Sequence, residues 1–244
     1  MKEKINYEFI KKTLLFPESG ILVIGDLHIG YEHAIRQSGI LLPESQINEI
    51  IDELRDVFDI INKKQIKLKK VIFLGDIKHS FGYDWQEKNY FREVSDFLKN
   101  YIGEKNIIFI KGNHDTVDYS FGKMKNYYIY KNLAFVHGHE SFPKVFEKEI
   151  KVIVMGHIHP SIILRDKQNI KRERYKCFLT GKFKKKQVII LPSFLNITEG
   201  SPVNNYKDDY ENYFSIIPKK SLINFNVFVV GEDRVYAFGK VKEL

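Results

Sequence analysis

Five short apolar runs recur along the first two thirds of the chain, and their β-branched and aromatic residues predict buried strands. They occupy residues 21–24, 71–74, 107–110, 133–136 and 152–155. Apolar positions with helical spacing from Ile47 to Ile61, with Ser45 as the N-cap, and from Phe91 to Tyr101 predict two amphipathic helices between the first three strands. The order strand, helix, strand, helix, strand favours a parallel sheet with right-handed crossovers.

Further apolar runs predict hairpins at both ends of the chain. Residues 7–16 are expected to be extended and to pair, across a turn at 17–20, with the strand at 21–24. From residue 127 onward short strands alternate with turns, at 127–130, 161–164, 175–180, 188–191, 226–230 and 235–238. Because no internal repeat and no linker rich in Pro, Gly or Ser interrupts the sequence, we expect one α/β domain over residues 1–244.

Each of the five runs ends in a polar turn, and the histidines gather there. The chain has eight histidines, and seven of them lie within five residues after the end of a run. A single histidine is more often a surface or core residue than a ligand, but random placement would rarely give this distribution. The ends of parallel strands lie side by side at one edge of a sheet, so these turns should converge. The convergent set is Asp26, His28, Asp76, Asn113, His114, His137, His157 and His159.

The chemistry of this set indicates metal binding. Carboxylates, imidazoles and an amide oxygen suit borderline divalent ions such as Mn²⁺, Fe²⁺, Co²⁺, Ni²⁺ or Zn²⁺, whereas Ca²⁺ prefers oxygen ligands alone. The set holds more ligands than one tetrahedral ion can use. It therefore predicts a two-metal centre, with ions about 3.5–4 Å apart, which would clamp the attacking and leaving oxygens of a phosphoryl displacement.

The composition indicates the cellular compartment and the kind of binding partner. The single cysteine, Cys177, excludes an internal disulfide framework and indicates a reducing compartment. The N-terminus lacks the apolar core of a signal peptide, and no apolar stretch approaches the roughly 18 residues of a membrane helix, so we expect a soluble cytoplasmic protein. The formal net charge of +8 suits a polyanionic partner such as nucleic acid, although genome-wide composition bias gives the same charge.

Five motifs, in order, resemble those of the calcineurin-like metallophosphoesterases. They are Asp26-Leu-His28, Gly75-Asp76, Gly112 to Asp115, His137 and Gly156 to His159. The resemblance implies a four-layer α/β/β/α sandwich. It also implies that Asp26, His28, Asp76 and His159 bind one ion and that Asp76, Asn113, His137 and His157 bind the other. In this family's pattern a metal-bridging hydroxide attacks phosphorus, and His114 assists the leaving group.

The sequence also suggests roles for four neighbouring residues. Asp115 either orients His114 or forms a turn by bonding its own backbone. His139 stands two residues after His137, and the family pattern favours His137 as the ligand. His79 replaces the commoner aspartate and is expected to touch substrate or a metal-bound water. Arg36 is either a phosphate contact or a surface helix residue.

A closer resemblance points to DNA. The run from Gly25 to Gly30, Arg36, residues 39–43 and the late run from Leu191 to Val203 look like the bacterial ligase-associated DNA damage response endonucleases and their archaeal relatives. The resemblance implies a DNA-repair setting, two ions with Mn²⁺ foremost, and a helicase or ligase partner. The basic segments 62–70 and 165–186 either follow a phosphate backbone or are a solvated helix end and an exposed hairpin.

Three functions remain open at this point. The first is a metal-dependent phosphodiesterase, a nuclease acting on DNA. The second is a small-molecule phosphatase or cyclic-nucleotide phosphodiesterase of the same fold. The third, a non-catalytic binding protein, would show missing metal ligands, and the sequence lacks none of them.

Overall fold

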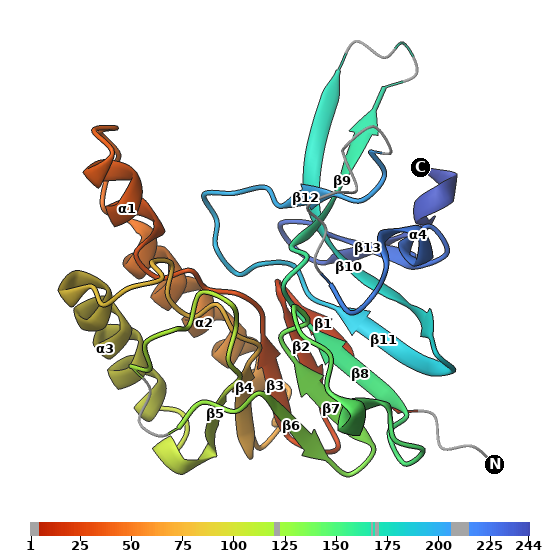
Figure 1. The fold of residues 1–244 in the computed structure, drawn as a ribbon, viewed down its shortest axis with the longest axis horizontal. Coiled ribbons are helices and arrows are strands. Elements are labelled where there is room, and N and C mark those ends of the chain that lie inside the picture. Colours follow the sequence, from red (N-terminus) through yellow and green to blue (C-terminus); the bar gives the residue numbers. More distant parts are fainter. Residues whose placement is uncertain (1–4, 120–122, 167, 169–170, 206–214) are drawn as a thin grey trace.

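Two β-sheets lie face to face in the structure, a computed structural model that describes residues 5–119, 123–166, 168, 171–205 and 215–244. The first sheet has five strands in the order β1-β2-β3-β4-β5. The second has nine strands, with β12-β9-β10-β11-β8-β7-β6 as its main path and β13 and β14 attached through β10. Figure 1 shows the long helices on the side of the first sheet that faces away from the second.

The first sheet contains the predicted parallel unit. Its strands are β1 (Glu8–Ile10), β2 (Thr13–Phe16), β3 (Ile21–Ile24), β4 (Lys70–Phe73) and β5 (Ile107–Phe109). Strands β3, β4 and β5 run parallel, and β2 pairs with β3 in the predicted hairpin. The expectation of one extended segment over residues 7–16 is wrong, because β1 and β2 form a hairpin of their own. Lys11, at φ 50°, makes that turn without the glycine or asparagine that would have signalled it.

Both predicted helices are present. Helix α2 spans Gln46–Lys63 and helix α3 spans Trp85–Lys99. Ser45 precedes α2 as predicted, but its hydroxyl bonds the carboxylates of Glu32 and Glu49. The Glu32 carboxylate accepts 2.8 Å bonds from the backbone N–H groups of Ser45 and Gln46, so Glu32 satisfies the N-terminus of α2 from outside the helix.

Asp84 caps α3 by accepting a 2.8 Å bond from the N–H of Glu87. A third helix, α1 (Tyr31–Gln37), was not predicted because its seven residues are too few to show a helical stripe. It follows the first polar turn directly and carries Arg36 in its last turn.

The second sheet is built mainly from hairpins, as predicted. Its strands pair antiparallel except where β8 joins β7 and β11, and where β12 joins β9. Strand β10, at twelve residues, is twice the predicted length. The elements are β6 (Tyr127–Tyr130), β7 (Leu133–Val136), β8 (Val152–Met155), β9 (Pro160–Arg165), β10 (Arg172–Phe183), β11 (Lys186–Ile190), β12 (Ser201–Pro202), α4 (Lys219–Leu222), β13 (Asn226–Val230) and β14 (Val235–Lys240), with short 3-10 helices at Glu104–Asn106, Pro143–Phe146 and Val241–Glu243.

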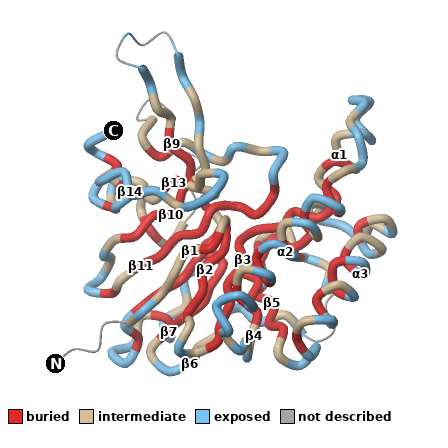
Figure 2. Tube along the Cα trace, turned by 180° about the vertical axis from the view of Figure 1, so that it is seen from behind, coloured by how far each residue is buried: buried red, intermediate tan, exposed pale blue. Residues whose placement is uncertain are grey.

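Three apolar layers hold the sandwich together. The central layer joins the inner faces of the two sheets and includes Val23, Ile72, Phe135 and Val154. A second layer lies between the first sheet and helices α2 and α3. A third lies on the outer face of the second sheet, under α4 and the 3-10 helices Pro143–Phe146 and Val241–Glu243. Figure 2 shows the buried positions concentrated along the strands. The four-layer α/β/β/α order is confirmed, and its outermost layer is thin.

Two further observations concern the basic segments and the membrane. Of the basic segment 165–186, residues 172–176 pair with β9 in the hairpin that projects from the body in Figure 1, whereas residues 177–183 pair with β11 and β13 inside the second sheet; residues 167 and 169–170 lie outside the described chain. Residues 1–4 of the N-terminal segment also lie outside it. Within the described residues no helix is long and apolar enough to cross a membrane.

Candidate metal centre

Five polar turns meet at one end of the two sheets. They follow β3, β4 and β5 of the first sheet and β7 and β8 of the second, all at the carboxyl ends of these strands. Backbone bonds tie two of the turns together: the N–H of His28 donates to the carbonyl of Asp76 at 2.9 Å, and that of Ile29 donates to Ile77 at 2.8 Å. The parallel register of the strands thus places residues from distant parts of the sequence side by side.

One group of side chains combines Asp26, His28 and His159, whose ligand atoms lie within 4.8 Å of one another. The Nε2 atom of His159 is 3.4 Å from Oδ1 of Asp26 and also 3.4 Å from Nε2 of His28. Asp26 is completely buried and His28 is nearly so. A carboxylate and two imidazoles at these separations form three sides of a transition-metal site.

A second group combines Asp76, His137 and His157. The Nε2 atom of His137 lies 3.5 Å from Oδ2 of Asp76, 3.1 Å from Nδ1 of His157 and 3.1 Å from Oδ1 of Asn113. The same Oδ2 of Asp76 is 3.8 Å from Nε2 of His28 in the first group. The structure therefore brings all seven predicted metal ligands together, with Asp76 between the two groups.

The backbone at the ligands is strained. His28, Asp76, His157 and His159 have φ values of 45°, 45°, 66° and 47°, in the left-handed region that side chains rarely adopt. Such conformations persist where the surrounding structure over-determines them, and they cluster at functional sites. Here they turn the side chains of neighbouring strand ends toward one point.

Two motif glycines lie directly against the ligands. A Cβ atom at Gly112 would be 2.1 Å from Oδ1 of Asp76, and one at Gly156 would be 2.4 Å from Oδ2 of Asp26. Any other residue at either position would displace a carboxylate. The sequence showed these glycines as turn residues, and the structure shows that they also make room for the acidic ligands.

The two buried aspartates of the centre favour the binding of positive charge. Burial raises the pKa of Asp76, and the nearby Asp26 carboxylate raises it further, to about 8. Burial would also raise the pKa of Asp26, but His159 and His137 outweigh that effect and hold it below its usual value. Burial lowers the pKa of His137 to about 3, so its imidazole is neutral and able to ligate. Two buried acidic side chains beside the neutral imidazole of His137 fit divalent cations by ligand type.

His114 lies beside this centre with a fixed ring. Its Nδ1–H donates to the carbonyl oxygen of His79 at 2.5 Å, which leaves Nε2 as the ring nitrogen available to a ligand or substrate. Asp115 does not orient the ring. Its two carboxylate oxygens accept bonds from the backbone N–H groups of Ile77, Lys78 and Gly112, so it has the turn-forming role.

Of the three predicted substrate contacts, His79 and His139 lie near the centre and Arg36 does not. The ring centroid of His79 lies 5.5 Å from that of His114 and 4.7 Å from that of Tyr31. His139 is half-buried, with its ring centroid 5.1 Å from the fully buried His137. Arg36 forms an ion pair with Glu44 and is not among the residues that converge.

An aromatic side chain that the sequence reasoning missed covers His114. Phe81 stacks on its ring with centroids 4.4 Å apart and an interplanar angle of 26°. Phe81, Tyr83 and Trp85 are all well exposed, at 58%, 60% and 66%. The signal was available as three aromatic residues at alternate positions just after the second polar turn.

A buried lysine, also missed, holds the loop beside Asp26. The N–H of Phe194 donates to the backbone carbonyl of Asp26 at 2.8 Å. The carbonyl of Phe194 in turn accepts a 2.5 Å bond from Nζ of Lys12, which pairs with Glu53 at 2.6 Å. The sequence carried no signal for this, because Lys12 follows Lys11 in a basic turn. The late run noted above is thereby joined to the first metal-ligand turn.

Known proteins resemble the chain in sequence and in fold. The family model for calcineurin-like phosphoesterases matches residues 20–176. No curated protein matches the sequence. The crystal structure of nuclease MPE from Pseudomonas putida covers 96% of this chain and 100% of its own, with a TM-score of 0.61 at 19% identity, which shows a shared fold.

Two other solved structures match less closely. A conserved uncharacterized protein from Streptococcus pneumoniae, described as a predicted phosphoesterase, covers 90% of this chain and 97% of its own, with a TM-score of 0.35 at 14% identity. Wild-type Vps29 from Entamoeba histolytica, complexed with zinc, covers 89% and 96%, with a TM-score of 0.38 at 13% identity.

Proposed function

The chain belongs to the calcineurin-like phosphoesterases, and from this premise we propose that it is a nuclease that hydrolyses DNA phosphodiesters with two divalent transition-metal ions. The observation that carries the proposal is the position of Asp76 between two groups of ligand side chains. A two-metal centre acts on both the attacking and the leaving oxygen of a phosphodiester. We take Mn²⁺ as the first ion to test, and DNA repair as the setting.

The ligands divide between the two ions around Asp76. Asp26, His28, Asp76 and His159 would hold one ion, and Asp76, Asn113, His137 and His157 the other. When bound, the ions supply Lewis-acid chemistry, which polarises phosphoryl oxygens and lowers the pKa of water. The preset turns let these side chains bind cations with little rearrangement.

His114 serves the leaving group. Because Nδ1 is held by the carbonyl of His79, the ring presents Nε2 to substrate, and a proton on Nε2 can pass to the departing oxygen. Asp115 supports this geometry indirectly, since it fastens the turn after β5 to the turn after β4. His79 is itself a proposed substrate contact, because its ring lies next to that of His114.

The aromatic side chains beside His114 support a nucleic acid substrate. Exposed aromatic rings offer platforms on which bases stack, whatever the base sequence. Phe81 already stacks on His114, and Tyr83 and Trp85 continue the same exposed segment. A phosphodiester at the metal centre would therefore have aromatic faces within reach of its flanking bases.

A basic pocket offers contacts to a phosphate backbone. It has a volume of about 570 Å³ and runs along β5 from Lys105, before the amino end of the strand, to Lys125, which pairs with Ile110 beyond its carboxyl end. Its charged lining residues are Lys70, Lys105, Lys123, Lys125 and one acid, Glu104. Lysines neutralise phosphates without reading sequence, so the pocket favours a polyanion over a small phosphate ester. The name of the Pseudomonas putida nuclease supports the same choice.

The proposal is tested with a panel of substrates in Mn²⁺. We expect purified protein to cleave bis(p-nitrophenyl) phosphate and DNA, and Asp76→Ala to lose both activities, while the surface variant Asp52→Ala keeps them. DNA cleavage retained in Asp76→Ala would refute the assignment. Preference for a phosphomonoester or a cyclic nucleotide over DNA would refute the nucleic acid substrate and leave the metal-dependent phosphoesterase standing.

A further inference from the structure

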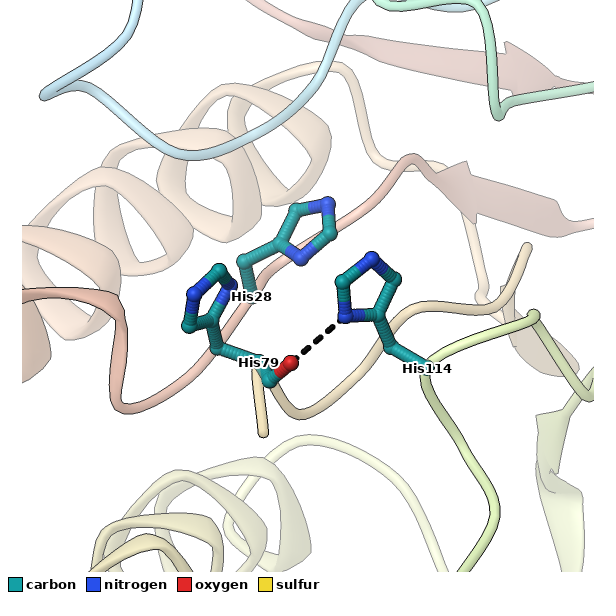
Figure 3. A group of neighbouring side chains, drawn as sticks. All are labelled: His28, His79 and His114. Atoms are coloured by element: carbon teal, nitrogen blue, oxygen red, sulfur yellow. Dashed lines mark hydrogen bonds between the residues drawn. The ribbon is translucent and has the colours of Figure 1, made fainter. Parts of the chain in front are cut away.

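A third group of possible metal ligands lies beside the centre; it shares His28 with the first proposed ion, and its other two histidines are ligands of neither ion. It consists of His28, His79 and His114, whose ligand nitrogens lie within 4.8 Å of one another. The ring centroids are 5.7 Å apart for His28 and His79, 5.0 Å for His28 and His114, and 5.5 Å for His79 and His114. Figure 3 shows the three rings gathered around one space.

Two buried ring nitrogens in this group lack a partner within the part of the chain that the structure describes. They are Nδ1 of His28 and Nδ1 of His79. His28 is only 6% exposed, and Figure 3 shows its Nδ1 directed toward the other two rings. A metal-ligating histidine almost always donates its second ring N–H to a carboxylate, a carbonyl or water. A buried ring nitrogen left without a partner is destabilising, so this nitrogen points to a bound species.

The nitrogen of His114 that faces the group is also available. Because Nδ1 donates to the carbonyl of His79, Nε2 is the atom that can ligate. The group thus supplies Nδ1 of His28, Nε2 of His114 and a nitrogen of His79. Three imidazoles with a fourth position for water match the ligand set of zinc in sites with an open position.

We propose that His28, His79 and His114 bind a third transition-metal ion, with zinc as the best fit, and that this ion inhibits the enzyme. A tetrahedral zinc site with Zn–N bonds of about 2.0–2.1 Å needs nitrogens about 3.3 Å apart, so modest ring rotations close the present separation. The ion takes the place of the Nδ1 proton of His28, which is released to solvent, while Nε2 stays directed at the first ion.

Inhibition follows from the use of His114. Its Nε2 atom cannot hold a zinc ion and carry a proton for the leaving group at the same time. Excess zinc should therefore suppress catalysis without displacing either of the two working ions. This inference rests on the proposed metal centre but not on DNA being the substrate.

Zinc stoichiometry tests the third site directly. We expect equilibrium dialysis against excess Zn²⁺, followed by elemental analysis, to give one ion fewer per chain for His79→Asn and for His114→Asn than for the wild type. His33→Asn is the matched control, because His33 lies on α1 and pairs with Gln37 and Asp84 outside the group. It should bind as many ions as the wild type. Circular dichroism would verify that each variant is folded.

Two outcomes would overturn the inference, and they are distinguishable. If the wild type and both variants bind two ions each, the third site is wrong and the two-metal centre stands. If the wild type binds neither zinc nor manganese, both proposals fail. As a second readout, zinc-edge anomalous diffraction from zinc-soaked crystals should show a peak among the three rings, and a water peak without anomalous signal would contradict it.

Discussion

Replacing Asp76 by asparagine should stabilise the metal-free protein while removing its ability to bind metal. Asp76 is 2% exposed and faces the buried Asp26, so its negative charge is disfavoured in the folded chain without cations. Asparagine has nearly the same shape and no charge. Its amide oxygen can keep the 2.9 Å bond that Oδ1 of Asp76 accepts from the N–H of His114.

The size of the effect follows from the pKa of Asp76, which rises from its ordinary value of 3.8 to about 8 in the folded chain. Between these values the folded chain holds a proton that the unfolded chain has released, so wild-type stability falls as pH rises. pH 7 lies about three units above the ordinary pKa of Asp76. Each of these units lowers the unfolding free energy of the wild type by about 1.4 kcal/mol. Asp76→Asn should therefore gain about 4 kcal/mol at pH 7, and the gain should grow by about 1 kcal/mol for each pH unit from 6 to 8.

Urea unfolding of metal-stripped protein measures this gain. Wild type, Asp76→Asn and the control Asp52→Asn would be compared in EDTA at pH 6, 7 and 8. Asp52 is exposed and paired with Arg55, so its variant should shift by less than about 1 kcal/mol. A gain that is absent at pH 7, or that does not increase with pH, would refute the reasoning. Manganese should stabilise the wild type and leave Asp76→Asn unchanged.

Three other substitutions test the architecture around the centre. Gly112→Ala should lower manganese-dependent cleavage of bis(p-nitrophenyl) phosphate by about 100-fold, because its Cβ overlaps the carboxylate of Asp76. Lys12→Met leaves the partly buried Glu53 and the carbonyl of Phe194 without their partner and should cost about 3 kcal/mol in urea unfolding, whereas Lys11→Met on the surface should cost less than about 1 kcal/mol. Phe81→Ala should lower the ratio of DNA cleavage to bis(p-nitrophenyl) phosphate cleavage about tenfold, through lost base stacking.

The predictable part of the fold was the part with strong periodicity. Helix α2 was recognisable because its apolar positions repeat over many turns, and β3, β4 and β5 because continuous apolar runs are typical of strands buried on both faces. The metal ligands followed from these strands, since each lies a few residues beyond a strand end. The rule that parallel strands end at the same edge accounts for the convergence within each sheet, but the sequence did not show that the ligands come from two sheets whose edges lie together.

The missed features depend on contacts between distant segments. The bond from Lys12 to Phe194 joins residues 182 positions apart, and the role of Asp115 depends on N–H groups 37 and 38 positions away. The hairpin turn at Lys11 has no glycine to mark it, and α1 is too short for a periodic stripe. Local pattern carries no information about such contacts, so the sequence left both roles of Asp115 open.

The sequence locates the metal site but does not show how far the site destabilises the metal-free fold. Four ligands hold left-handed backbone conformations, and two carboxylates are buried close together. Each feature destabilises the metal-free chain, and each is fixed by its surroundings: parallel strands, and bonds such as that from His28 N–H to Asp76. Because the structure sets this geometry before any cation arrives, binding free energy need not be spent on rearrangement. The gain in unfolding free energy of metal-free Asp76→Asn would therefore measure how much stability the fold loses by holding a cation-binding carboxylate in place.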